Sequence, residues 1–96
     1  MKKIKAGLDN LSAARGNLEG EINLQWDSIK NAVSYIIEFS CQGSLKETKW
    51  KILDIISDSR YTVRNLKSNK TYLFRIASAD EKGMKQISVN IAKKAP

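Results

Sequence analysis

Residues 71–79 read Thr-Tyr-Leu-Phe-Arg-Ile-Ala-Ser-Ala and give the clearest sign of the fold. Within them, the large apolar side chains of Tyr72, Phe74 and Ile76 alternate with a second set that includes Arg75. A period of two places each set on its own face of a β-strand, because successive residues of a strand point to opposite sides. We therefore predict a strand over 71–79 that turns its aromatic and isoleucine side chains toward a core.

The same alternation continues in both directions from this stretch. Turn signals rich in Gly, Asn, Asp and Ser separate the runs, and short strands at roughly 8–12-residue spacing are typical of a sandwich or barrel. The segment 45–56 is less regular, because its apolar residues fit either a short strand with an irregular connection or a helical turn. We predict seven strands, near residues 9–14, 21–26, 34–41, 47–53, 60–64, 71–79 and 86–92.

Two antiparallel sheets packed face to face would let the inward sets of these strands form one core. The chain is therefore predicted to be all-β, a sandwich of seven antiparallel strands. Its 96 residues suffice for one domain. We expect residues 1–7 to form a flexible N-terminal extension, residues 8–93 the domain, and residues 94–96 a C-terminal tail.

The composition is basic, with a net charge of +7 from 17 Lys and Arg residues against 10 Asp and Glu residues. Such an excess fits a polyanionic partner, whether nucleic acid, lipid headgroups or acidic polysaccharide. It also fits a solvated face that keeps a small β-protein soluble and its strand edges unpaired, which is the preferred interpretation. Only four of these cations are arginines, the better residue for bidentate phosphate contact, which argues against nucleic acid.

Missing residue types exclude most catalytic designs. The sequence has no histidine and a single cysteine, Cys41, which rules out a Cys-His pair, a serine triad with a histidine base and a zinc site of the usual ligands. Carboxylate pairs such as Asp54 with Asp58, or Asp80 with Glu81, are better explained as surface acids. Cys41 cannot form an internal disulfide and is expected to be half-buried in a strand. We predict no enzymatic activity, no catalytic residue, no cofactor and no metal site.

Several segments resemble the fibronectin type III domain in their order and spacing. Trp26 closes the second predicted strand, as a core tryptophan does in that family. The segments that carry the rest of the resemblance are 32–39, 61–66, 71–79 and the hairpin-like 80–88 with Gly83. The resemblance covers about residues 8–92 and implies a seven-stranded immunoglobulin-like β-sandwich of a small bacterial type. The loop at 80–85 contains no Arg-Gly-Asp, so the integrin binding of some members does not carry over.

The resemblance also indicates the interior of the domain. Tyr72 matches the tyrosine corner of such sandwiches, whose hydroxyl bonds back to the chain upstream, here near Leu66. The corner at 67–69 departs from the family, which commonly has proline or glycine there. The expected core residues are Leu24, Trp26, Tyr35, Ile37, Tyr61, Leu66, Tyr72, Phe74 and Ile76.

The resemblance implies a protein-interaction or spacer module that binds through loops at one pole or through an edge strand. Loops on a rigid sandwich cluster at its two poles, and one pole would carry the loops at 27–33 and 80–85. Met84 is expected to be an exposed apolar tip there. Trp50 is expected either to pack on the sheet or to serve as a ligand platform. The candidate binding residues are Lys30, Trp50, Lys82, Met84 and Lys85.

A protein is the expected partner, and three alternatives stay open. Carbohydrate association would need a row of exposed aromatic residues, for which only Trp50 is a candidate. Charge-driven binding to a polyanionic surface predicts a steep loss of binding as salt rises. Self-association through the edge of the first or last strand would make the protein a weak homo-oligomer rather than a monomer.

No apolar run approaches the roughly 18 residues of a membrane span. The basic start of the chain is not followed by the apolar stretch of a secretory signal. The location is therefore expected to be cytoplasmic by default, and extracellular or at the cell surface if a leader was removed.

Overall fold

The computed structural model describes residues 10–41, 49–83, 85–88 and 90–96. These residues form strands and turns, and this part of the chain has no helix long and apolar enough to cross a membrane. The strands are β1 (Ser12–Arg15), β2 (Ile22–Gln25), β3 (Ala32–Cys41), β4 (Lys51–Ile56), β5 (Arg60–Val63), β6 (Thr71–Asp80), β7 (Lys85–Ile87) and β8 (Ile91–Lys94).

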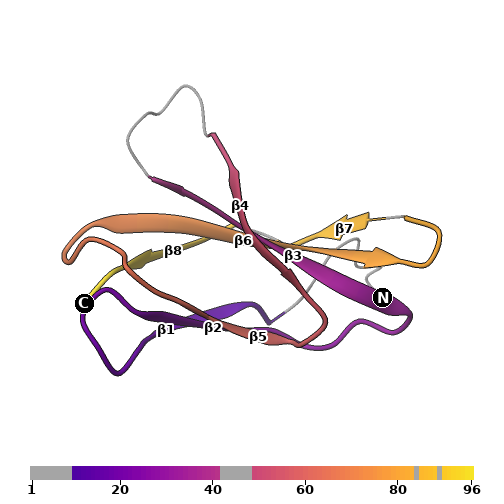
Figure 1. The fold of residues 1–96 in the computed structure, drawn as a ribbon, viewed down its shortest axis with the longest axis horizontal. Helices are drawn as coiled ribbons and strands as arrows, with labels where there is room; N and C mark the ends of the chain where they lie inside the picture. The colour runs from indigo at the N-terminus through magenta and orange to yellow at the C-terminus, as the bar shows by residue number, and fades with distance from the viewer. Residues whose placement is uncertain (1–9, 42–48, 84, 89) are drawn as a thin grey trace, which may run out of the picture.

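The strands form two antiparallel sheets that pack as two layers (Figure 1). One sheet has the order β1-β2-β5, and the other has the order β4-β3-β6 with β7 and β8 both beside β6. Because β7 and β8 occupy one position along the same edge of β6, the eight segments fill seven strand positions. The predicted seven-stranded antiparallel sandwich is therefore confirmed.

The last predicted strand, at 86–92, is interrupted rather than continuous. Ser88 lies between β7 and β8, and its buried hydroxyl accepts a hydrogen bond from the backbone N–H of Ile76 at 2.9 Å. The backbone N–H of Ser88 donates in turn to the carbonyl of Ile76 at 2.8 Å. A side chain thus supplies a bond that regular strand pairing would have made.

The inward faces of both sheets meet in one core. Its buried residues are Ile22, Leu24, Trp26, Tyr35, Ile37, Val63, Tyr72, Phe74, Ile76 and Ala95. Of the positions expected from the sequence, Tyr61 and Leu66 are only half-buried and pack against this cluster from its edge. The rings of Trp26 and Tyr35 meet edge to face with centroids 5.5 Å apart, an arrangement that aromatic pairs favour.

Two buried tyrosines tie loops to this core through their hydroxyl groups. The hydroxyl of Tyr72 accepts a hydrogen bond from the backbone N–H of Lys67 at 2.9 Å, next to Leu66, as the tyrosine corner predicts. The hydroxyl of Tyr35 accepts one from the backbone N–H of Ile29 at 2.8 Å. These two hydrogen bonds anchor one loop at each end of the sandwich to the core.

The fourth strand differs from its prediction. It runs from Lys51 to Ile56 instead of 47–53, of which 47 and 48 lie outside the described residues. Its pairing with β3 shifts register between Ile37 and Glu38. This irregularity breaks the alternation of apolar residues along β4, which is why the sequence pattern misplaced the strand.

Cys41 was predicted to be half-buried, and this is wrong because the residue is exposed. It is the last residue of β3, whereas the pairing with β4 reaches only to Phe39. No residue in the described part of β4 therefore stands beside Cys41.

Residues 94–96, expected to be a tail, pack against the sandwich. Ala95 is only 2% exposed. Its backbone N–H donates to the carbonyl of Lys70 at 2.9 Å, and its own carbonyl accepts from the N–H of Asn69 at 2.8 Å. These bonds join the end of β8 to the turn between β5 and β6.

Candidate functional site

The outer face of the five-stranded sheet carries an apolar row that crosses four strands. Ile36 of β3 stands opposite Ile55 of β4 on one side and Ala77 of β6 on the other, and Ala77 stands opposite Ile87 of β7. Directly opposed residues share a face of a sheet, and Ile36 lies between two core residues and so points outward. We call Ile36, Ile55, Ala77 and Ile87 the apolar row.

The two ends of the apolar row are open to solvent. The exposed fraction is 58% for Ile55 and 48% for Ile87, whereas Ala77 between them is almost completely buried. Ile52, which stands opposite Glu38 on the same face, is 59% exposed and extends the row along β4. Large apolar side chains gathered on one face, rather than scattered singly, are typical of an interaction surface.

A charged and aromatic cluster lies beside Ile52 on this face. The Nε of Arg75 lies 2.7 Å from Oε1 of Glu38, and the Arg75 Cζ lies 4.2 Å from the centre of the Trp50 ring. All three residues are half-buried. The ion pair neutralises the two charges and holds the guanidinium over the indole, a favourable cation–π arrangement. Trp50 therefore packs on the sheet with one ring face covered by Arg75.

The outer face of the three-stranded sheet is different in character. The Thr62 hydroxyl donates to Oδ1 of Asn23 at 2.8 Å across β5 and β2. The neighbouring pair, Gln25 and Arg60, is exposed and polar. The contrast between the two outer faces singles out the five-stranded sheet as the one with an unpartnered apolar surface.

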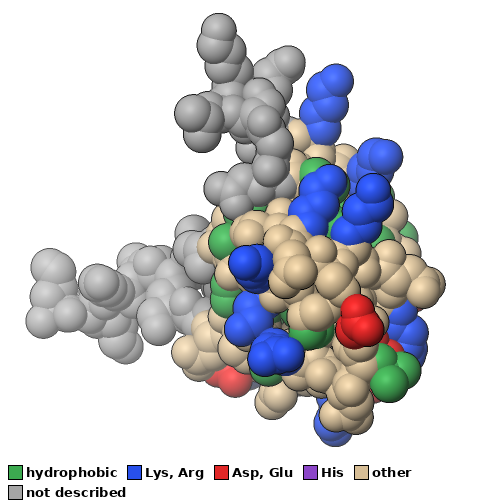
Figure 2. Space-filling model, turned by 90° about the vertical axis from the view of Figure 1, so that its left-hand side faces the viewer, with side chains coloured by type: hydrophobic (Ala, Val, Ile, Leu, Met, Phe, Trp, Pro, Cys, Tyr) green, Lys and Arg blue, Asp and Glu red, His purple; other side chains and the backbone are tan. Residues whose placement is uncertain are grey.

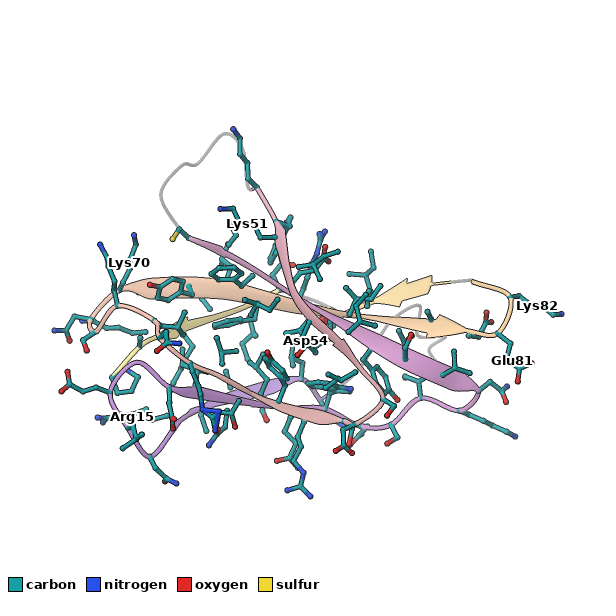
Figure 3. The ribbon with its side chains drawn as sticks, viewed as in Figure 1. Arg15, Lys51, Asp54, Lys70, Glu81 and Lys82 are labelled. Atoms are coloured by element: carbon teal, nitrogen blue, oxygen red, sulfur yellow. The ribbon has the colours of Figure 1, made fainter. Side chains whose placement is uncertain are left out.

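The structure brings together the two loops that the sequence placed at one pole. Ala32 pairs with Asp80, and a hollow of about 430 Å³ opens beside them. Figure 3 shows Glu81 and Lys82 at this end of the molecule, opposite the end that carries Arg15 and Lys70. The residues that line the hollow are Asn31, Ala32, Val33, Asp80, Glu81 and Lys82.

The other candidates at this pole are placed unevenly. Lys30 is exposed in the turn next to the hollow. Lys82 is exposed, and its backbone N–H donates to Oδ1 of Asp80 at 2.9 Å. Lys85 begins β7, and Met84 lies outside the described residues. The pole thus has a hollow of mixed polar and apolar lining that includes Lys82, with Lys30 in the adjoining turn.

In the described part of the chain, neither surface carries a constellation of catalytic groups. Among the residues that the structure describes, no group of three or more Cys, Asp or Glu side chains could hold a metal ion. The pKa of the Tyr61 phenol is raised, first by burial and then by the nearby carboxylate of Asp54, which also accepts its hydrogen bond. A phenol with a raised pKa stays protonated at neutral pH and is a poor base.

The apolar row was not found from the sequence, although a signal was present. Tyr35, Ile36 and Ile37 are three consecutive large apolar residues, whereas a strand with one solvated face alternates. Ile52 and Ile55 are also large apolar residues of a strand. Because β4 is irregular, however, the sequence did not show which of its residues point outward. An apolar residue at an outward position was the sign of a second apolar face.

The fold is that of the fibronectin type III domain. A Fn3-like protein from Clostridium thermocellum superposes with a TM-score of 0.76 and 20% sequence identity, and the match covers 96% of each chain. The FN5 domain of Drosophila Lar gives 0.69 and 19% over 97% of this chain and 98% of the other. The domain of human fibronectin type III domain containing protein 3 gives 0.67 and 21% over 98% and 91%. No protein-family model and no curated protein sequence matches the chain.

Proposed function

We propose that this domain is a protein-interaction module without catalytic activity, and that it contacts its partner through the apolar row. The fibronectin type III fold supports the role of a generic module. The observation that carries the proposal is the in-register alignment of Ile36, Ile55 and Ile87 on one outer face, with Ile55 and Ile87 about half exposed.

The chemistry of this face favours a protein partner with an apolar contact surface. Interfaces are depleted of free charge at their centre and enriched in aromatic residues and arginine. Here the charges of Arg75 and Glu38 neutralise each other, and Trp50 is already fixed against the guanidinium. When a partner covers this cluster, Trp50, Arg75 and Glu38 would lose little side-chain entropy, because their mutual contacts already order them. The row also lies on paired strands rather than on a loop, so its shape is rigid.

The test uses a triple variant, Ile52→Thr with Ile55→Thr and Ile87→Thr, and a control, Gln25→Ser, which alters an exposed residue on the outer face of the other sheet. Threonine keeps the branched shape that suits a strand. The wild type and both variants are used to capture proteins from source cells, and each captured candidate is then purified and titrated against all three by calorimetry.

We expect a partner whose dissociation constant rises by about 100-fold or more in the triple variant, since each isoleucine buried at an interface contributes roughly 1–2 kcal/mol. The Gln25→Ser control should bind as the wild type does. Unfolding free energies should stay within about 0.5 kcal/mol per substitution, because the replaced side chains are exposed. A partner that binds the triple variant normally and loses affinity for Lys30→Gln with Lys82→Gln would instead place the contact at the hollow beside these lysines.

A further inference from the structure

The pole opposite the hollow carries a cluster of cations, and it stands apart from the surface proposed above. Its residues come from the end of β1, from the turn between β5 and β6, and from the end of β8. Figure 2 views this end of the molecule and shows Lys and Arg side chains over much of it. We call this cluster the basic pole, made of Arg15, Lys67, Lys70, Lys93 and Lys94.

The cations of the basic pole form no ion pair with another described residue. Within residues 10–41, 49–83, 85–88 and 90–96, no carboxylate lies at ion-pair distance from any of the five. Arg15, Lys93 and Lys94 line a shared hollow of about 350 Å³. Like charges held together in excess of the nearby acidic groups concentrate a positive potential that attracts anions.

An exposed leucine projects from the same pole. Leu18 is 66% exposed in the turn between β1 and β2. The N–H of Glu21 donates to its carbonyl at 3.2 Å, and the N–H of Gly20 donates to the carbonyl of Pro96 at 3.0 Å. The first bond closes the turn, and the second joins it to Pro96, just beyond β8, which brings the leucine turn to the end of the strand that carries Lys93 and Lys94.

We infer that the basic pole docks on an anionic lipid surface, with Leu18 entering the headgroup region. Basic residues within a Debye length of a membrane are attracted by anionic headgroups, and an exposed apolar side chain among them gains by leaving water. Single-stranded nucleic acid is the weaker candidate. Its binding sites stack bases on aromatic side chains, and none of the five cations or the leucine turn supplies one.

Two acidic residues lie at this pole, and they decide which variant should strengthen binding rather than weaken it. Glu21 is already paired with Arg64, at 3.3 Å between Oε2 and Nε. Glu19 is exposed, with one oxygen accepting a hydrogen bond from the Ser68 hydroxyl at 3.0 Å. Removal of the Glu19 charge should therefore strengthen binding to an anionic surface, although it removes a polar contact.

The experiment measures sedimentation of the protein with phosphatidylcholine vesicles that contain none or about one-third phosphatidylserine. The test variant is Lys70→Gln with Lys94→Gln. The matched control is Lys30→Gln with Lys82→Gln, which removes the same charge from the opposite pole. A fluorophore sensitive to polarity is placed by Leu18→Cys in a Cys41→Ser background, and a DNA duplex serves as the competing polyanion. Urea unfolding checks that every variant is folded.

We expect binding only to the anionic vesicles, with a partition coefficient about 30-fold lower in the test variant, since each cation contributes about fivefold. The control pair should change it by less than about twofold, Glu19→Gln should raise it, and the fluorophore should shift to the blue on the vesicles. Equal losses in both lysine pairs would overturn the proposal, because net charge alone would then explain the binding. Binding to the duplex as tight as to the vesicles, without a fluorescence shift on the vesicles, would also overturn it.

Discussion

Tyr72→Phe removes a single oxygen atom from the interior and leaves the ring in place. That oxygen accepts the hydrogen bond from the backbone N–H of Lys67 at 2.9 Å, and Tyr72 is itself only 5% exposed. A donor left without an acceptor in a half-buried position costs about 1–2 kcal/mol. A domain of this length is stabilised by only about 5–15 kcal/mol in total, so the change is a large part of its stability.

The assay is urea unfolding followed by tryptophan fluorescence, to which the buried Trp26 and the half-buried Trp50 both contribute. We expect the midpoint to fall while the slope stays constant, because the surface exposed on unfolding is unchanged. The melting temperature should fall by about 5–15 °C. Tyr61→Phe is the control, since its phenol lies at the edge of the core and bonds to a surface carboxylate. If Tyr72→Phe cost no more than this control, the hydroxyl would not be what holds the turn.

Three further changes test other parts of the structure by the same unfolding assay. Ser88→Ala should cost about 1–3 kcal/mol, because it leaves a buried backbone N–H of β6 unpaired, and a cost near zero would show that regular strand pairing replaces the bond. Gly20→Ala should cost more than about 1 kcal/mol and more than Gly83→Ala, because both have positive φ but only the former would place a Cβ 2.5 Å from the carbonyl oxygen of Leu66. The raised pKa of Tyr61 means that the native protein keeps a proton that the unfolded chain loses. The stability of the wild type is therefore full below pH 10 and declines as the pH rises through the native pKa. The stability of Tyr61→Phe should decline less between pH 9 and 11, and equal declines would contradict this.

The sandwich was predictable because its core strands alternate over most of their length. In β2, and in β6 from Thr71 to Ile76, every second residue is buried, so the pattern alone identified the inward faces. The same logic failed for β4, where the register shift opposite Ile37 breaks the period of two. It also failed at Ser88, because a hydroxyl that replaces a backbone partner leaves no periodic trace in the sequence.

The candidate surfaces were less predictable than the fold. Alternation shows which residues face the core, but an outward isoleucine gains meaning only from its neighbours across the sheet. Ile36 and Ile87 are far apart in the chain, and they belong to one row because both stand opposite Ala77, on its two sides. The basic pole has the same origin, since Arg15 and Lys94 come from opposite ends of the sequence. The net charge includes these cations, but only the topology of the fold shows that they lie at one pole.

The two proposed contacts are geometrically compatible. β6 begins at the basic pole with Thr71 and contributes Ala77 to the apolar row. Six residues of strand separate these positions by about 20 Å, roughly twice the screening length at an ionic strength of 0.1 M. The row faces outward from the sheet, whereas the basic pole lies at the end of the sheet where β6 begins and β8 ends. A domain resting on lipid through Lys70 and Lys94 would therefore hold the apolar row clear of the membrane, and the free energies of the two contacts should add.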